Sequence, residues 1–182
     1  MELPMDFRSE LKRRLIVFDG AMGTMIQRYG LSPGQPPETF NIPHPDVVEG
    51  IHRQYIEAGA DVITTNTFGA NEFKLKGTGY TVEQVITRTA VLARRAAGNK
   101  WVALDMGPIG QLMEPMGWLS FEQAYELYAR QVKAGVQGGL TSLVMALTCG
   151  LDAPVVDLEN ARIVETIKAF RILNGDKGIG YM

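Results

Sequence analysis

Three short apolar segments of the chain each end in a polar residue followed by a loop that contains glycine. These segment ends read Asp19-Gly20, Asn66-Thr67-Phe68-Gly69 and Asp105-Met106-Gly107. In parallel α/β folds the ligand site lies at the carboxyl ends of the strands, because the loops that follow the strands converge there. At one strand such a residue could simply cap a turn or a neighbouring helix. Three in succession favour a site that binds a polar ligand.

Other residues with chemical potential are weaker candidates. His44 and His52 are eight positions apart without a glutamate at metal-ligand spacing, so we expect structural or surface roles for both. For the loop carboxylates, among them Glu38, solvated or capping roles are the default expectation. Cys149 alone cannot form a zinc site, which needs three or four protein ligands. The glycine-rich loops at 20–23 and 107–110 complete neither a dinucleotide nor a P-loop motif.

The elements that must position these residues alternate between strand and helix. Buried-strand patterns cover 15–18, 61–66, 101–105 and 143–147, and we expect the first to be buried on both faces. Four helical patterns alternate with these strands. The first begins at Pro45 and stops at Gly59, and the second begins after a capping box at Thr81 and stops at Gly98. The third begins after a capping box at Ser120, runs to Ala134 and stops at Gly135, and the fourth covers 158–173. The proline-bearing stretch 32–45 is expected to be a loop.

This alternation predicts an α/β fold with a parallel sheet and right-handed crossovers. We expect one domain over residues 1–182, because the chain has no clear linker and no low-complexity tract.

The composition argues against a nucleic-acid-binding, membrane-spanning or disulfide-bonded protein. The 182 residues include 18 Lys and Arg against 20 Asp and Glu, a formal charge of −2 that gives no electrostatic footprint for nucleic acid or a membrane surface. No apolar run is long enough to span a membrane, and the amino-terminal residues lack a signal-peptide pattern. One cysteine excludes an internal disulfide. We therefore expect a cytoplasmic location.

Several segments, in order along the chain, resemble the homocysteine S-methyltransferase family, and most closely the homocysteine-binding domain of cobalamin-dependent methionine synthase. The resemblance covers about residues 13–136, and the sequence diverges over 137–182. The segments that carry it are Phe18-Asp19-Gly20-Ala21-Met22-Gly23-Thr24, Pro37-Glu38-Thr39-Phe40-Asn41, Ile51-His52 with Tyr55, Ala58 to Asn71, Gly107-Pro108-Ile109-Gly110, Pro115-Met116-Gly117 and Phe121-Glu122-Gln123-Ala124.

The resemblance implies a TIM-type (β/α)₈ barrel, of which this chain holds about the first four units. It implies transfer of a methyl group to the thiol of homocysteine, which zinc binds and activates as a thiolate. In a full-length protein of the methionine synthase type, methylcobalamin or methyltetrahydrofolate would then be the methyl donor, carried by cobalamin- and folate-binding domains. Related branches of the family imply a methyl-sulfonium or betaine donor instead. By position, the residues that match the substrate-binding set are Asp19, Gly20, Ala21, Asn66, Thr67 and, more weakly, Asp105.

The sequence also departs from the family. The Asn-Cys strand end and the Gly-Gly-Cys-Cys loop that supply the family's zinc ligands are absent, so no metal role passes to Cys149. The sequence therefore identifies no catalytic residue, and we expect the chain to have no activity on its own. The alternative is a non-catalytic, truncated half-barrel that binds a small amino acid or a partner chain, such as the missing half-barrel. Such a half-barrel would expose strand edges and favour self-association.

Overall fold

Two short parallel strands lie at the centre of the computed structural model, which describes residues 7–140. Strand β1 (Val62–Thr64) pairs with β2 (Trp101–Ala103), with Val62 opposite Trp101. The segment that ends at Asp19 runs parallel to the other edge of β1, where the Val17 carbonyl accepts hydrogen bonds from the Asp61 and Val62 amides. Three parallel segments, joined by helical crossovers, therefore place their carboxyl ends side by side.

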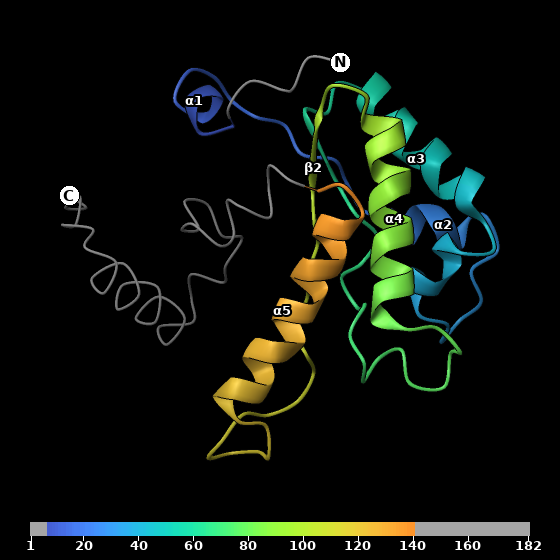
Figure 1. The fold of residues 1–182 in the computed structure, drawn as a ribbon. Coiled ribbons are helices and arrows are strands. Elements are labelled where there is room, and N and C mark those ends of the chain that lie inside the picture. Colours follow the sequence, from blue (N-terminus) through green and yellow to red (C-terminus); the bar gives the residue numbers. More distant parts are fainter. Residues whose placement is uncertain (1–6, 141–182) are drawn as a thin grey trace. The chain divides into compact units, whose positions relative to one another are not determined.

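Helices α3 and α4 pack against this sheet, and α4 lies between α3 and α5 (Figure 1). The helices are α1 (Phe7–Leu11), α2 (Met22–Gln27), the 3₁₀ helix η1 (Pro37–Asn41), α3 (Pro45–Glu57), α4 (Val82–Ala97) and α5 (Phe121–Gln137). Capping boxes start α4 and α5 as the sequence predicts, because the side chains of Thr81 and Ser120 accept from the amides three residues on. No helix within the described residues is long and apolar enough to cross a membrane.

The alternation of strand side chains divides the core into two layers. Ile63 and Val102 point to the helices and pack with the buried face of α4. Val62, Trp101 and Ala103 point to the other side of the sheet, where Phe7 and Ile16 cover part of them. The sheet is thus apolar on both faces, as is typical of parallel strands.

The first predicted strand is the main difference between sequence and structure. Residues 15–18 form a single bridge, from Phe18 to Val62, instead of a full strand. The expectation that both faces are buried is wrong, because Leu15 is 84% exposed and Val17 and Phe18 are each 47% exposed. An apolar run shows that a segment belongs to a sheet, but it does not show whether the segment lies at the edge.

Two further predictions need correction. The stretch 32–45 contains the helical turn η1, because Pro37 stands at its first position, where a missing amide costs nothing. Gly135 does not end α5, which continues to Gln137. A Cβ at Gly135 would lie 2.9 Å from Leu104 Cδ2, so this glycine allows the helix to approach the segment after β2.

Other predictions lie beyond the described residues. The strand over 143–147, the helix over 158–173 and Cys149 are among these. The chain divides into two units, Met1–Cys149 and Gly150–Met182, and the second lies wholly outside the described residues. The single domain over 1–182 therefore stays a prediction.

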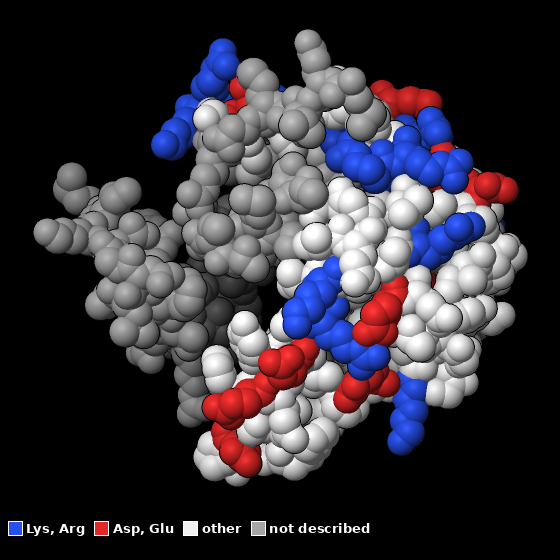
Figure 2. All heavy atoms as spheres, in the orientation of Figure 1, with Lys and Arg blue, Asp and Glu red and all other residues white. Residues whose placement is uncertain are grey.

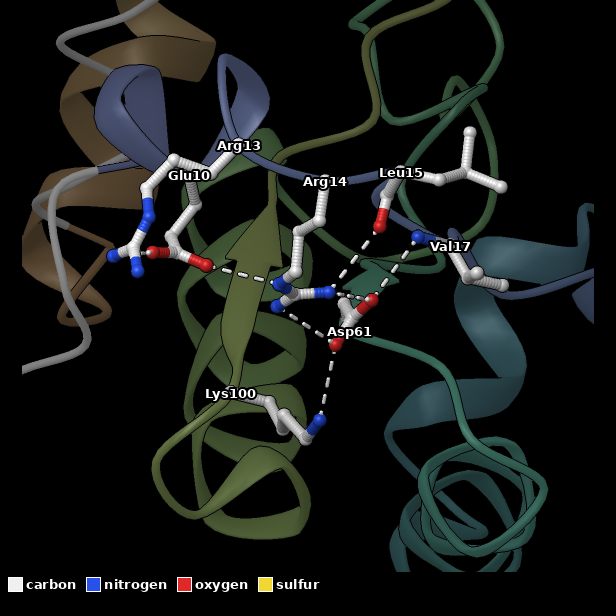
Figure 3. Close-up of polar contacts among 7 residues, drawn as sticks. All are labelled: Glu10, Arg13, Arg14, Leu15, Val17, Asp61 and Lys100. Carbon is white, nitrogen blue, oxygen red and sulfur yellow. Dashed lines mark hydrogen bonds and ion pairs between the residues drawn. The ribbon is translucent and has the colours of Figure 1, made fainter.

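An ion-pair network fixes the amino ends of the strands, opposite the candidate site. Asp61, just before β1, accepts from Arg14 at 2.8 and 3.2 Å and from the Lys100 ammonium at 3.1 Å (Figure 3). Arg14 also donates to Glu10 at 2.9 Å. Since Lys100 directly precedes β2, this network connects three segments that are distant in sequence.

Acidic and basic side chains also lie next to one another on the surface seen in Figure 2. One such group of charges is Arg130 of α5, which pairs with Glu83 at the start of α4 and with Glu72 at 3.3 Å in the structure. These pairs join the last two described helices at their exposed faces.

Candidate functional site at the carboxyl ends of the strands

Asp19 follows the first sheet segment and is held against the end of β1. Its two carboxylate oxygens each accept from the Thr64 amide at 3.0 Å, and Oδ1 also accepts from the Thr64 hydroxyl at 2.9 Å. Burial raises the pKa of Asp19 to about 6, and the nearby Asp105 carboxylate contributes in the same direction. The carboxyl group is therefore fixed in place and poised to change charge just below neutral pH.

Gly20 and Ala21 continue this first loop, next to Tyr55 of α3. The Tyr55 hydroxyl donates to the Ala21 carbonyl at 3.2 Å. A Cβ at Gly20 would lie 3.0 Å from the same hydroxyl oxygen, so a side chain there would press on the tyrosine. The small residues at 20 and 21 thus let the backbone pass close to Tyr55.

Asn66 lies after β1 and forms a reciprocal amide pair with Asn41 of η1. The Asn66 side chain donates to the Asn41 side-chain oxygen at 2.7 Å and to the Pro37 carbonyl at 2.9 Å. In return, the Asn41 side chain donates to the Asn66 carbonyl at 2.9 Å and to the Thr89 hydroxyl at 2.6 Å. Both asparagines are buried, and their hydrogen bonds to each other connect η1 to the loop that follows β1.

Thr67 and Asp105 belong to a closed ring of hydrogen bonds between the second and third loops. The Thr67 hydroxyl donates to the Asp105 carbonyl at 2.7 Å, and the Asp105 amide donates to the Thr65 hydroxyl at 3.0 Å. The two threonine hydroxyls are 2.6 Å apart. Because the Thr67 proton is used on Asp105, Thr65 donates to Thr67. The backbone of Asp105 is thereby fixed, while its carboxylate makes no hydrogen bond within the described part of the chain.

The carboxylate of Asp105 is also influenced by Glu38. Burial raises the pKa of Asp105, and the charge of Glu38 raises it further. The expectation that Glu38 is solvated is wrong, because this residue is only 5% exposed. It accepts from the Gly69 amide at 2.5 Å. The three carboxyl groups of Asp19, Asp105 and Glu38 therefore belong to one electrostatic group at this end of the sheet.

All six predicted site residues lie at the carboxyl ends of the parallel segments. Some of them border the candidate site, and others hold its loops together. Asp19, Asp105 and the Gly20–Ala21 backbone border the site. Asn66 and Thr67 use their polar groups to hold the loops together. Sequence reasoning missed the roles of Asn41, Thr64 and Tyr55, whose partners lie more than 20 residues away along the chain.

The donor set within residues 7–140 does not fit zinc. That range contains no cysteine and no group of three or more His, Asp or Glu residues that could hold a metal ion. His44 stacks on Phe40 with ring centroids 4.3 Å apart. His52 is fully buried in α3, where no described residue hydrogen-bonds to its ring, and burial lowers its pKa to about 4. Both histidines therefore have structural roles. The residues described in 7–140 do not form a metal site, so we derive no chemical step that uses a metal.

The family of the chain follows from comparison with known proteins. A model of the family described as homocysteine S-methyltransferase matches residues 16–166. The chain belongs to the homocysteine S-methyltransferase family. The resemblance seen in the sequence motifs is thereby confirmed, and the family match continues past residue 136, where the motifs end, to residue 166.

Curated relatives of this family member are longer proteins. Methionine synthase of Mycobacterium leprae (strain TN) is 33% identical over 159 residues, which cover 79% of this chain and 13% of the relative. Methionine synthase of Mycobacterium tuberculosis (strain ATCC 25618 / H37Rv) is 31% identical over the same shares of both chains. The chain thus spans about 13% of the length of these relatives.

Solved structures agree on the fold. The homocysteine methyltransferase MmuM from Escherichia coli, in its metallated form, matches with a TM-score of 0.62 at 22% identity, over 73% of this chain and 54% of that one. The oxidised form matches with a TM-score of 0.63 at the same identity, over 73% and 53%. The predicted α/β class with parallel strands is therefore confirmed, and over the matched part the chain shares the fold of these proteins.

Proposed function

We propose that this chain forms the first part of a TIM-type barrel and supplies one wall of a homocysteine site in an enzyme of the methionine synthase type. Such an enzyme transfers a methyl group to the thiol of homocysteine to give methionine. The observation that carries the proposal is the convergence of Asp19, the Gly20–Ala21 backbone and Asp105 at one end of the sheet, in a chain whose relatives are named methionine synthase.

The chemistry of this wall suits the amino-acid end of homocysteine. The carboxyl groups of Asp19 and Asp105 lie close enough for the charge of Asp105 to raise the pKa of Asp19. A substrate ammonium placed between them would relieve that repulsion and favour their charged forms. The backbone N–H groups of Gly20 and Ala21 are the donors that we assign to the substrate carboxylate, and these two residues have no side chain or a single methyl group.

The family implies that bound zinc would lower the pKa of the homocysteine thiol, so that it reacts as a thiolate at neutral pH, and that methylcobalamin or methyltetrahydrofolate would supply the methyl group. None of the described residues fits a zinc ligand set, so we propose for this chain the binding and orientation of homocysteine alone. In the longer protein, cobalamin- and folate-binding domains would be its partners.

A binding experiment tests the proposal. We expect L-homocysteine added to the ¹⁵N-labelled chain to shift the amide resonances of Thr64, Asn66 and Thr67, and Asp19→Asn to weaken this binding about tenfold. Asp46→Asn is the matched control, since Asp46 is exposed at the start of α3. Shifts confined to other regions, or equal affinity in the Asp19→Asn variant, would overturn the proposal.

The exposed edge of the sheet favours a second proposal, association with another chain. Leu15, Val17 and Phe18 present apolar side chains beside a strand edge, which is a template for pairing. Light scattering tests it: we expect a dimer or larger species that Val17→Lys reduces to a monomer. A wild-type monomer at high protein concentration would contradict this proposal.

A further inference from the structure

Glu38 is a buried acid whose environment differs from that of an ordinary loop carboxylate. It lies in η1, is 5% exposed, and accepts a hydrogen bond from the Gly69 amide at 2.5 Å. No described cation pairs with it. A carboxylate that has lost its water without gaining a counter-ion is costly, and it persists where other interactions hold it.

The contact between Glu38 and Gly69 leaves no room for a side chain. A Cβ at Gly69 would lie 2.6 Å from Oε1 of Glu38 and 2.9 Å from its carboxyl carbon. Gly69 therefore allows the acid to reach the backbone of the turn that follows β1. This turn also includes Asn66 and Thr67, so Glu38 binds the loop that carries two of the six predicted site residues.

The same turn is bonded to the third loop. The Gly107 amide donates to the Phe68 carbonyl at 2.9 Å, and the Thr67 hydroxyl donates to the Asp105 carbonyl at 2.7 Å. Glu38 thus holds one side of the turn, and the segment of Asp105 holds the other. A displacement of Glu38 would be transmitted to Asp105 through one short, hydrogen-bonded turn.

The charges around this turn are mostly negative. Besides Glu38, the charged groups linked to this turn include Asp105 after β2 and Lys74, whose ammonium lies 5.3 Å from the centroid of the Phe68 ring. Asp19 interacts in turn with Asp105. The negative charge of Glu38 disfavours a second negative charge on Asp105 and favours a cation beside it. A proton or an ammonium group could supply that positive charge.

We infer that Glu38 is a positioning residue of the homocysteine site, which fixes the turn after β1 through Gly69 and directs a cationic amine to Asp105. The inference rests on the proposed function for the identity of the ligand. Its structural part, the action of Glu38 on the turn and on Asp105, can be tested without any ligand.

The first test uses NMR on the ligand-free chain. Glu38→Gln keeps an oxygen that can accept from the Gly69 amide but removes the charge. We expect the Asp105 carboxyl resonance to titrate at lower pH in this variant, while the resonances of residues outside the site stay in place. Glu57→Gln is the matched control, because Glu57 is exposed at the end of α3. An unchanged Asp105 titration in folded Glu38→Gln would overturn the inference.

A second variant keeps the test decisive if Glu38→Gln fails to fold. Glu38→Asp retains the charge but withdraws it from the turn by one methylene group. We expect the Gly69 amide proton to move upfield and the Asp105 titration to shift part of the way. An Asp105 titration identical to that of the wild type, with the Gly69 amide shifted, would equally overturn the inference.

The ligand arm compares homocysteine with 4-mercaptobutyrate, which lacks the amine. We expect Glu38→Gln to weaken homocysteine binding about threefold to tenfold and to leave 4-mercaptobutyrate binding unchanged. A purely structural role would weaken both ligands alike and would contradict the proposed role in directing the amine. If wild-type chain binds neither ligand, the proposed function fails, whereas the action of Glu38 on Asp105 is still decided by the ligand-free titration.

Discussion

Arg14 and Asp61 form a two-point ion pair at the end of the sheet opposite the candidate site. The guanidinium donates to one carboxylate oxygen at 2.8 Å and to the other at 3.2 Å (Figure 3). The Val17 amide donates to the same carboxylate at 3.2 Å. Asp61 therefore connects the segment before the sheet to the start of β1, and the strands are aligned at this end while their other ends carry the polar loops.

We predict that Asp61→Asn lowers the free energy of unfolding by about 1–3 kcal/mol at pH 7, because the change removes the negative charge and one of the two acceptor oxygens that Arg14 and Lys100 bind. The Arg14 guanidinium holds the pKa of Asp61 well below its usual range. For an acid with a lowered pKa in the folded state, the stabilisation is present above its unfolded pKa, near 3.9, and disappears as the pH falls toward the folded value. Urea unfolding at pH 7 and pH 3 measures both effects.

The variant Lys12→Gln serves as the control for this prediction, since Lys12 is exposed in the same amino-terminal region. We expect it to match the wild type at both pH values. An Asp61→Asn variant as stable as the wild type at pH 7 would show that the pair contributes nothing.

The reciprocal pair of Asn41 and Asn66 should show strong energetic coupling. Each single change to alanine leaves buried donors or acceptors unsatisfied, at a cost of about 1–3 kcal/mol for each such group. The double variant removes both partners, so we predict that it is more stable than the sum of the single changes implies, by about 0.5–3 kcal/mol. Urea unfolding of the four proteins in the cycle measures this coupling.

Ser120→Ala provides the comparison for the cycle. It removes the capping box of α5 and should cost about 1 kcal/mol. Because Ser120 shares no partner with Asn41, its effect should simply add to that of Asn41→Ala. Additive behaviour of Asn41 and Asn66 as well would contradict a reciprocal pair.

Local sequence signals predicted those features of the fold that depend on neighbouring residues. Thr81 and Ser120 each have a glutamine three positions later, and both capping boxes form where predicted. Pro45 begins α3 because its fixed φ and missing amide suit a first helical position. In each case the chemistry that sets the element lies within one turn of the residue concerned.

Features that depend on distant contacts could not be predicted in the same way. Glu38 has its partner 31 residues away at Gly69, and Asn66 has its partner 25 residues away at Asn41. The sequence placed Asp19, Asn66 and Asp105 at strand ends, but the choice between bordering the site and holding a loop is made by tertiary contacts. Gly135 shows the same limit, since only the approach of Leu104 distinguishes a packing glycine from a helix stop.

Gly107 should be required for the contact between the second and third loops. A Cβ there would lie 2.5 Å from the Phe68 carbonyl oxygen and 2.8 Å from its ring. We predict that Gly107→Ala costs about 1–3 kcal/mol, because backbone atoms must move to accept the methyl group. Thermal unfolding compares it with Gly50→Ala inside α3, where the space is open and alanine should stabilise the helix by about 0.5–1 kcal/mol. Equal stability of the two variants would contradict the contact.

Asp19 should give the stability of the chain a pH dependence opposite in sign to that of Asp61. Its pKa of about 6 in the folded state lies above the unfolded value near 3.9. The stabilisation is therefore complete below pH 3.9 and is lost as the pH rises through 6, where the buried carboxyl group must take up a charge. The Thr64 amide proton, which donates to this carboxylate, should report the same change with a midpoint near pH 6.

The variant Asp19→Asn tests this assignment directly. The asparagine keeps an oxygen that can accept from Thr64 but cannot ionise, so the Thr64 titration should disappear and unfolding at pH 8 should require at least as much urea as for the wild type. Homocysteine binding should weaken in the same variant, because a site residue that is costly to charge is retained for its ligand and not for stability. A Thr64 midpoint near 4 in the wild type, or one that persists in Asp19→Asn, would show that the carboxyl group is not the titrating group at this end of the sheet.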